Sequence, residues 1–411
     1  MERRWLILAD DLTGAADSAV AFARRRVPSK VVWGDALPEA HADAVVLAYD
    51  LATRELDAPR AALRHADALR RLARPGMRLF KKIDSTLRGH PAEELAAMMD
   101  VLLADEPGMR VVFTPAFPAM GRTVLGGEPR VRGVPLPANL VNLIENAGLP
   151  AHSVALNGVR AGASVLRAAL MKDRTTQRAS VAVCDAETDE DLERIAFAVM
   201  SNDLPVLFAG SAGLAHALAQ QVSRAGAPRS SPDRREPTAR GALVVVGSRA
   251  NASRESLARL STLDNLRCVS VEPAALRGDA QSAAQDSLAR SIAASLADGV
   301  DVVVDIAQTG ETPGDTRAPL ASALAHWLAP AAREASAIMA TGGETAAALF
   351  ARLGVEGIRL VDEIEPGIAL GLTLGELSLP AVTKAGGFGD QDCLRRIVSR
   401  LRFIRQTGTV A

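Results

Sequence analysis

Short apolar runs alternate with longer amphipathic stretches along most of the 411-residue chain. The runs have the length of buried strands, and the stretches between them have the length and periodicity of helices. A repeated order of strand then helix predicts a mainly parallel sheet with helices on both faces, so the expected fold class is α/β. In the first half, strands are expected at Trp5–Ala9, Ala44–Tyr49, Arg78–Phe80, Val111–Phe113, Val181–Cys184 and Pro205–Ala209, with helices at Ala15–Arg25, Ala58–Ala73 and Ala92–Ala104.

A segment rich in proline, serine and charged residues interrupts this alternation at 227–241. The segment has no apolar periodicity, which is typical of an interdomain linker. We therefore predict two domains, 1–226 and 242–411, each a mainly parallel sheet flanked by helices. In the second domain, strands are expected at Ala242–Val246, Val300–Ile306, Ser336–Ala340 and Arg359–Val361, with helices at Arg254–Leu260, Ala283–Ala297, Leu320–Ala337, Glu344–Leu353 and Asp392–Arg402.

Charge and composition argue against several classes of protein. Lys+Arg total 47 and Asp+Glu total 48, so the net charge of −1 does not favour binding to nucleic acid or to an anionic membrane. Aromatic residues make up 3% of the chain, which leaves little material for stacking on bases. The three cysteines form no C-x-x-C pair, and no apolar run is long enough to span a bilayer. We expect a cytoplasmic protein without a nucleic-acid or membrane partner. The sequence leaves open whether the chain forms a homo-oligomer.

Ligands of open α/β sheets gather at the carboxyl ends of the strands, so polar residues there are the first candidates for a site. Asp10 and Asp11 directly follow the first expected strand. Their carboxylates could orient a substrate hydroxyl, accept its proton or reach a metal. Thr13 and Gly14 could present backbone N–H groups to an anion at the start of the next helix. The plainer alternative is that one of these aspartates only caps that helix.

A second polar cluster, Lys81–Gly89, follows the strand Arg78–Phe80. Lysine is scarce in this chain, yet two lysines stand here beside an acid, two hydroxyls and an arginine. Such a loop could hold an acid with several hydroxyl groups: Lys82 would neutralise charge, Ser85 would donate and Asp84 would accept from hydroxyls. Otherwise Asp84 or Ser85 caps a helix and the cations are solvated. Arg54, after the strand Ala44–Tyr49, could clamp a carboxylate in the same way.

The segment Thr114–Leu136 is dense in proline and glycine, which predicts a long ordered loop without regular elements. Long loops in compact domains often bind ligands, and Arg122 and Thr123 are its polar candidates.

Three glycine-containing turns in the second half resemble one another. Each stands where a strand is expected to end or a helix to begin, so backbone N–H groups could approach a phosphate closely. One such turn is weak evidence, but three in one domain favour nucleotide phosphates. The candidate residues are Ser248, Thr341, Gly342, Gly343, Glu344, Thr345, Lys384, Gly386 and Gly387.

Several common signatures are missing from the sequence. It has no G-x-x-x-x-G-K-[ST] motif, no G-x-G-x-x-G after the first strand and no H-x-x-x-H spacing. These absences argue against a P-loop NTPase, a dinucleotide-dependent dehydrogenase and a zinc hydrolase. The run Gly210–Gly213 is not a G-x-S-x-G nucleophile elbow, and we interpret it as a close junction between a strand and a helix.

Three motifs together resemble the four-carbon acid sugar kinases. They are Ile-Leu-Ala-Asp-Asp-Leu-Thr-Gly-Ala-Ala-Asp at 7–17, Lys-Lys-Ile-Asp-Ser-Thr-Leu-Arg-Gly at 81–89 and Pro-Ala-Phe-Pro-Ala-Met-Gly-Arg-Thr at 115–123. Gly-Gly-Glu-Thr at 342–345 and Lys-Ala-Gly-Gly-Phe-Gly-Asp at 384–390 resemble the nucleotide-binding half of that family. The resemblance spans nearly the whole chain.

The resemblance implies an acid-sugar-binding domain, an ATP-binding domain and an active site in the cleft between them. It implies phosphorylation of the terminal C4 hydroxyl of threonate, erythronate or 3-oxo-tetronate, with ATP and Mg²⁺ as cofactors. Asp10, Asp11, Arg54 and the run 82–85, which includes Ile83, would hold the acid; Asp11 would orient the hydroxyl or accept its proton. The metal ligands stay unassigned. The chain departs from the family after Leu136, where an acidic, proline-containing segment is absent, and at Ala385, where relatives often have serine. A sugar-acid sensor and a kinase that binds without turnover are the alternatives.

Overall fold

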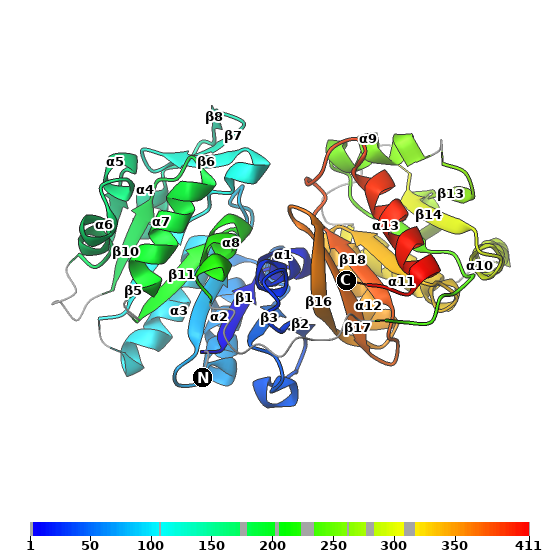
Figure 1. The fold of residues 1–411 in the computed structure, drawn as a ribbon, viewed down its shortest axis with the longest axis horizontal. Coiled ribbons are helices and arrows are strands. Elements are labelled where there is room, and N and C mark those ends of the chain that lie inside the picture. The colour runs from blue at the N-terminus through cyan, green and yellow to red at the C-terminus, as the bar shows by residue number, and fades with distance from the viewer. Residues whose placement is uncertain are drawn as a thin grey trace. The chain divides into compact units, whose positions relative to one another are not determined.

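The computed structural model describes residues 3–106, 108–172, 179–201, 205–222, 234–260, 263–276, 283–307 and 317–410. The chain divides into two compact units, Met1–Ala227 and Pro228–Ala411. Figure 1 shows strands and helices in each of them.

The first unit is built on a parallel sheet with the strand order β2-β3-β1-β4-β11-β5-β10-β9. Most of these strands are buried along their whole length, as expected when helices cover both faces. The strands are β1 (Trp5–Ala9), β2 (Ser29–Trp33), β3 (Val46–Asp50), β4 (Arg78–Lys82), β5 (Arg110–Thr114), β9 (Ala151–Val154), β10 (Ser180–Cys184) and β11 (Val206–Gly210).

The helices of this unit connect the strands across the sheet. They are α1 (Leu12–Ala23), α2 (Ala58–Leu72), α3 (Pro91–Asp105), α4 (Leu140–Asn146), α5 (Leu156–Val159), α6 (Ala163–Leu170), α7 (Asp189–Met200) and α8 (Ala212–Gln221), with single 3-10 turns at Pro38–His41 and Pro118–Met120. Helix α1 packs against α8, and α2 packs against α3 (Figure 1).

The direction of the connections marks one place on this sheet. From β1 the chain runs through α1 toward the β2 edge, whereas from β3 it runs through α2 back to β4 on the other side of β1. Right-handed crossovers in opposite directions place their helices on opposite faces. The carboxyl ends of β1 and β4 therefore border a topological switch point, the usual ligand position in such sheets.

The prediction that Thr114–Leu136 lacks regular elements is wrong. The structure forms a small antiparallel sheet there, with strands β6 (Arg122–Leu125), β7 (Glu128–Val131) and β8 (Val134–Pro135). Gly126 and Gly127 both have positive φ, 65° and 73°, which suits a two-residue hairpin turn. The same glycines that indicated a loop thus serve a tight turn between strands.

The second unit contains a sheet with the strand order β13-β14-β12-β15-β18-β17-β16. Strand β17 runs antiparallel to β16 and β18, and the other pairs are parallel. The strands are β12 (Leu243–Val246), β13 (Leu266–Val271), β14 (Asp301–Ile306), β15 (Ile338–Thr341), β16 (Val355–Glu365), β17 (Ile368–Gly375) and β18 (Pro380–Lys384). The helices are α9 (Asn251–Leu260), α10 (Ala283–Ala297), α11 (Arg317–Ala332), α12 (Gly343–Arg352) and α13 (Cys393–Thr407), with a 3-10 turn at Pro273–Leu276.

Helix α13 closes the core of this unit. Its apolar face, which includes Leu394, Ile397 and Leu401, is buried against Val244 and Leu370 of the sheet. The fold class is confirmed: each unit is a mainly parallel sheet flanked by helices. The expected strand Arg359–Val361 is the middle of the longer β16, and its antiparallel partner β17 was not predicted.

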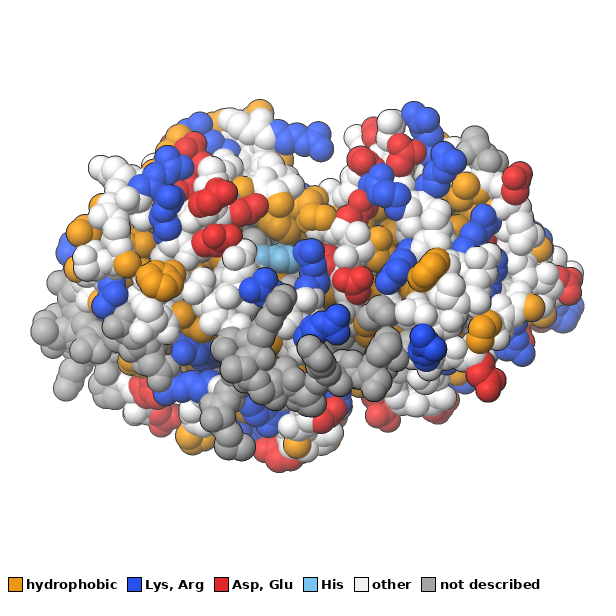
Figure 2. Space-filling model, in the orientation of Figure 1, with side chains coloured by type: hydrophobic (Ala, Val, Ile, Leu, Met, Phe, Trp, Pro, Cys, Tyr) orange, Lys and Arg blue, Asp and Glu red, His pale blue; other side chains and the backbone are white. Residues whose placement is uncertain are grey.

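The predicted linker 227–241 lies partly outside the described residues, which resume at Arg234. From there its backbone is tied to the second unit: Arg235 donates to the Gly408 carbonyl at 2.8 Å and Gly241 to the Leu296 carbonyl at 2.6 Å. Among the described helices, none combines the length and the apolar character needed to cross a bilayer. Figure 2 shows acidic and basic side chains intermixed over the visible face of each unit, as the near-zero net charge leads one to expect.

Candidate active site

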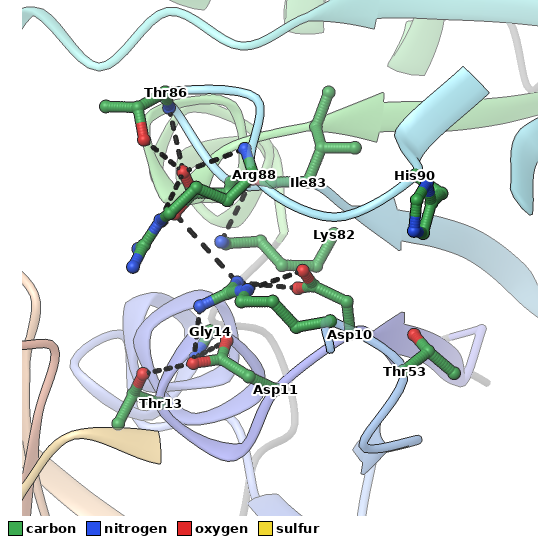
Figure 3. Close-up of polar contacts among 12 residues, drawn as sticks. Asp10, Asp11, Thr13, Gly14, Thr53, Lys82, Ile83, Thr86, Arg88 and His90 are labelled. Carbon is green, nitrogen blue, oxygen red and sulfur yellow. Dashed lines mark hydrogen bonds and ion pairs between the residues drawn. The ribbon is translucent and has the colours of Figure 1, made fainter. Parts of the chain in front are cut away.

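Two adjacent aspartates stand at the switch point, directly after β1. Asp11 is the N-cap of α1, and its carboxylate accepts from the Gly14 N–H at 2.9 Å and from the Thr13 hydroxyl at 2.6 Å. The Gly14 N–H is therefore used by Asp11 rather than presented to an external anion. Figure 3 shows Asp10, Asp11 and Lys82 directed toward a common region.

Arg54 joins the two aspartates. Its Nε and one terminal nitrogen each lie 2.7 Å from an oxygen of Asp10, and its other terminal nitrogen lies 2.7 Å from Asp11. A third carboxylate, that of Asp84, lies 3.9 Å away. The side chain of Arg54 is only 12% exposed. The predicted clamp on a substrate carboxylate is thus occupied, in this structure, by carboxylates of the chain itself.

In this arrangement the pKa values of the two aspartates shift in opposite directions. Burial raises the pKa of Asp10 even though Arg54 lies beside it. Burial also opposes ionisation of Asp11, but Arg54 and Lys82 outweigh it, and the pKa of Asp11 is lowered. Asp11 is therefore a permanent anion at neutral pH, suited to holding a hydroxyl group, while Asp10 holds a proton more readily.

The loop after β4 brings Lys82 and Asp84 to the same edge. The Lys82 ammonium donates to the Ile83 carbonyl at 3.0 Å. The same ammonium nitrogen packs close to Gly14, because a Cβ on Gly14 would lie 3.1 Å from it. Asp84 accepts from the Thr86 N–H at 3.0 Å, from the Thr86 hydroxyl and from the Arg88 guanidinium at 2.7 Å. Burial is outweighed by Arg88 and Arg54, so the pKa of Asp84 lies well below its usual range.

The remaining candidates of the first unit are Ser85, Ile83 and Arg122. Ser85 is buried, with 6% of its surface exposed, and Ile83 is buried as well, with its N–H donating to the Gly210 carbonyl. Arg122 begins β6; burial lowers its pKa, while the carboxylates of Asp84 and Asp17 act in the opposite direction. Arg122 therefore lies within electrostatic reach of Asp84.

The hairpin that carries Arg122 is fixed by a residue the sequence analysis missed. Asp185, at the end of β10, accepts from the Gly126 and Gly127 N–H groups at 2.8 and 2.9 Å. The glycine-rich sequence had predicted only a long loop, and nothing in the sequence connects Gly126 and Gly127 to an acid so distant along the chain.

Asp50 is a second residue that the sequence analysis missed. It ends β3 in register with Ala9, and the Ala52 N–H donates to it at 2.8 Å. Burial raises its pKa to about 7, and the negative charges of Asp11 and Asp10 add to this effect. A carboxyl with such a pKa at a strand end is a signal of function. Its position after an apolar strand could have indicated it.

In the second unit, three turns converge at the carboxyl ends of β12, β15 and β18. A Cβ on Gly247 would lie 1.9 Å from the Thr345 hydroxyl oxygen, and a Cβ on Gly386 would lie 1.9 Å from that of Ser248. Gly342, at φ 90°, is the N-cap of α12 and makes no side-chain cap. The structure thus brings Ser248, Gly342, Thr345 and Gly386 together. Thr341 ends β15, and Gly343 and Glu344 begin α12. A Cβ on Gly387 would meet no atom within 4 Å.

Lys384 is directed into the chain. Its ammonium donates to the Ser253 hydroxyl at 3.1 Å and to the Ala385 carbonyl at 3.2 Å, and burial lowers its pKa. The Ser253 hydroxyl in turn donates to the Gly386 carbonyl at 2.8 Å. In this structure Lys384 and Ser253 shape the turn that carries Gly386. Ser253 lies on α9, away from the glycine turns in sequence, which is why the motif analysis missed it.

The carboxylates of the first unit have the oxygen chemistry that Mg²⁺ prefers. However, every carboxylate oxygen of Asp10, Asp11 and Asp84 already accepts from a guanidinium, a hydroxyl or a backbone N–H. A Mg²⁺ bound directly by these three residues would therefore share each ligand oxygen with one of these donors.

Comparisons with known proteins agree with this architecture. Residues 5–218 match a family model described as a sugar-binding N-terminal domain, and residues 243–394 match one described as a nucleotide-binding C-terminal domain. A D-threonate kinase of Cupriavidus necator is 37% identical over 95% of this chain and 96% of its own length. A D-threonate kinase of Bordetella bronchiseptica is 35% identical over 98% of both chains.

Solved structures share the fold. A crystal structure from Salmonella typhimurium covers 96% of this chain and 98% of its own, with a TM-score of 0.77 at 23% identity. One from Haemophilus influenzae covers 97% and 100%, with a TM-score of 0.69 at 21% identity. The sequence matches confirm the resemblance that the motifs indicated, and the chain belongs to the four-carbon acid sugar kinase family.

Proposed function

We propose that this sugar-acid kinase transfers the γ-phosphoryl group of ATP to the C4 hydroxyl of a four-carbon sugar acid, with D-threonate as the first candidate. The observation that carries the proposal is the Asp10–Arg54–Asp11 constellation, a group of buried charges held at the switch point of the first sheet. The choice of D-threonate follows the names of two relatives, which are 37% and 35% identical to this chain.

In this proposal Asp11 orients the acceptor hydroxyl. Its lowered pKa keeps it ionised, and phosphoryl transfer needs positioning and charge stabilisation more than a strong base. Asp10, whose pKa is raised by burial, can take up the hydroxyl proton as the bond to phosphorus forms. Arg54 holds both carboxylates in place instead of binding the substrate carboxylate.

Other residues bind the carboxylate and the remaining hydroxyls of the substrate in this proposal. Lys82 supplies a buried positive charge beside Asp11, Ser85 a hydroxyl, and Arg122 a guanidinium from the hairpin. Asp84, held ionised by Arg88 and Arg54, can accept from a substrate hydroxyl. The backbone of Ile83 completes this set.

The second unit binds ATP in this proposal. Backbone N–H groups of the Gly342–Gly343 turn at the start of α12 would face the phosphates, together with Ser248, Thr345 and the Gly386–Gly387 turn. Mg²⁺ would reach the site on the nucleotide phosphates, as is usual for this ion in phosphoryl-transfer enzymes. The location of the active site between the two domains stays a prediction.

An ADP-release assay with ATP and Mg²⁺ tests the proposal across D-threonate, L-threonate, D-erythronate, L-erythronate and 3-oxo-tetronates, with glycerate and gluconate as controls. Turnover with a four-carbon acid and not with the controls is expected. If no acid is turned over although calorimetry detects ATP binding, the chain is a degenerate kinase. If ATP does not bind either, a sugar-acid sensor replaces the kinase.

A further inference from the structure

A buried network of polar side chains lies beneath the candidate site, and the proposed reaction uses none of its members. The Lys81 ammonium lies 2.6 Å from a carboxylate oxygen of Glu94, and these side chains are 0% and 1% exposed. The other oxygen of Glu94 accepts from the Thr53 hydroxyl at 2.8 Å. Lys81 also donates to the Lys82 carbonyl at 2.9 Å. One carboxylate on α3 thus connects the loop after β3 to the end of β4.

The network reaches the aspartates through the backbone next to Thr53. The Thr53 N–H donates to the Asp10 carbonyl at 2.9 Å, and the Arg54 N–H donates to the same oxygen at 3.2 Å. Thr53 is therefore held by its backbone on one side and by Glu94 on the other. Arg54 follows directly and places its guanidinium on both aspartates.

A neutral histidine completes the surroundings of Glu94. His65 Nδ1 donates to the Ala61 carbonyl at 3.1 Å and lies 3.6 Å from Glu94. Burial keeps the pKa of His65 well below its ordinary value, so this ring carries no charge at neutral pH. Lys81 then supplies the positive charge that balances Glu94.

A fully buried ion pair is a poor source of net stability, because the desolvation of both charges offsets their attraction. Apolar residues of similar volume would serve packing at least as well. The Lys81–Glu94 pair does what apolar residues could not: it gives the Thr53 hydroxyl a fixed acceptor and so sets the position of the next residue.

We propose that Glu94 and Thr53 are positioning residues that hold Arg54, and through it Asp10 and Asp11, in the arrangement the acceptor hydroxyl requires. The inference rests on the proposed kinase function. It predicts that disturbing the network changes the handling of the sugar acid and leaves the handling of ATP unchanged, because no member of the network belongs to the second unit.

The test compares Thr53→Val, which loses only the bond to Glu94, with Thr53→Ser, which keeps it. Thr373→Val is the control in the second unit: Thr373 is 1% exposed, donates to the Leu377 carbonyl at 2.6 Å and accepts from the Leu379 N–H at 2.9 Å, so this buried variant loses more hydrogen bonds than Thr53→Val. We expect Thr53→Val to lower kcat/KM for the acid about 10- to 100-fold, the scale of a small misplacement of catalytic groups, with KM for ATP unchanged. Thr53→Ser should restore most of this loss. Equal kcat/KM in Thr53→Val and Thr373→Val would overturn the proposal.

A second readout does not depend on activity. The Arg54 Nε–H donates to Asp10 at 2.7 Å, so its NMR resonance, assigned by its loss in Arg54→Lys, reports this contact. We expect the resonance to move in Thr53→Val and Glu94→Gln but not in Thr373→Val. If the unmodified protein turns over no acid, the proposed function fails while this signal still tests the positioning. An unmoved Arg54 resonance in Thr53→Val overturns the inference.

Discussion

At the scale of single residues, Asp11 has two tasks that sequence patterns treat as alternatives. It caps α1 through the Gly14 N–H, and it also accepts from Arg54. Both contacts stabilise its ionised form. The chain thus keeps an anion buried at the switch point, which would otherwise be costly.

Replacing Asp11 with asparagine tests its role. Asn keeps an oxygen that can cap α1 but removes the charge opposite Arg54 and Lys82. We expect turnover to fall at least ~100-fold, the scale of losing a group that positions the acceptor hydroxyl, while ATP binding stays intact. Steady-state kinetics and calorimetry with ATP measure the two effects. Near-normal turnover in Asp11→Asn would remove Asp11 from the mechanism.

The raised pKa of Asp50 should make the folded state less stable as pH rises toward neutrality. Its pKa is raised by burial from an ordinary 3.8 to about 7, so the folded state binds a proton that the unfolded state has released. Between these two values the free energy of unfolding should fall as pH rises, by up to about 1.4 kcal/mol per pH unit, and level off above pH 7. Asp50→Asn keeps an acceptor for the Ala52 N–H but has no proton to release, so its free energy of unfolding should not show this fall.

Urea denaturation across pH measures the effect. The Asp50→Asn variant should be more stable than the unmodified protein at pH 8 and differ least near pH 4. Asp35→Asn, at an exposed position, is the control. Parallel stability curves for Asp50→Asn and the unmodified protein would show that the folded state does not hold this proton.

At the scale of elements, the turn after β12 depends on the missing side chain of Gly247. A Cβ there would lie 1.9 Å from the Thr345 hydroxyl oxygen and 2.7 Å from the Thr345 Cβ, so the first turn of α12 would have to move. We expect Gly247→Ala to weaken ATP binding by about 10-fold or more, since phosphate contacts depend on this geometry.

Calorimetry with ATP measures this change. Gly158→Ala is the matched control, because its Cβ would meet Val154 at an ordinary 3.7 Å. Unchanged ATP affinity in Gly247→Ala would mean that the turn does not hold the nucleotide.

The elements also differ in how far the sequence could predict them. Buried parallel strands such as β1 and β10 have continuous apolar runs, and their positions were predicted closely. Helix α1 begins at Leu12 rather than near Ala15, because the cap at Asp11 adds a turn that apolar periodicity does not mark. Strand β16 was predicted too short because the acids Asp362, Glu363 and Glu365 follow its apolar run, and β17 was not predicted.

The sequence predicted the residues of the candidate site better than their contacts. Its residues stand at strand ends, which the sequence indicates, but their partners are set by strand order and register. Nothing local indicates that Arg54 contacts Asp10, or that Glu94 supports Thr53 from α3. The close junction predicted at Gly210–Gly213 is confirmed: a Cβ on Gly213 would lie 2.5 Å from the Ala116 carbonyl oxygen.

At the scale of the whole molecule, the candidate site residues of each unit lie at or near the carboxyl ends of its parallel strands. The first unit offers buried charged side chains, and the second offers glycine turns and a helix start without a side-chain cap. This division of chemistry matches the two family models along the chain. A kinase needs both kinds of site, whereas a sensor of sugar acids needs only the first.

NMR of the product made from ATP, Mg²⁺ and D-threonate identifies most directly the bond that the enzyme forms. We expect a new phosphate ester whose ³¹P signal is coupled to both protons of the C4 methylene group, which identifies transfer to the terminal hydroxyl. A ³¹P signal coupled to a single CH proton, or ATP left unconsumed with every four-carbon acid supplied, would contradict it.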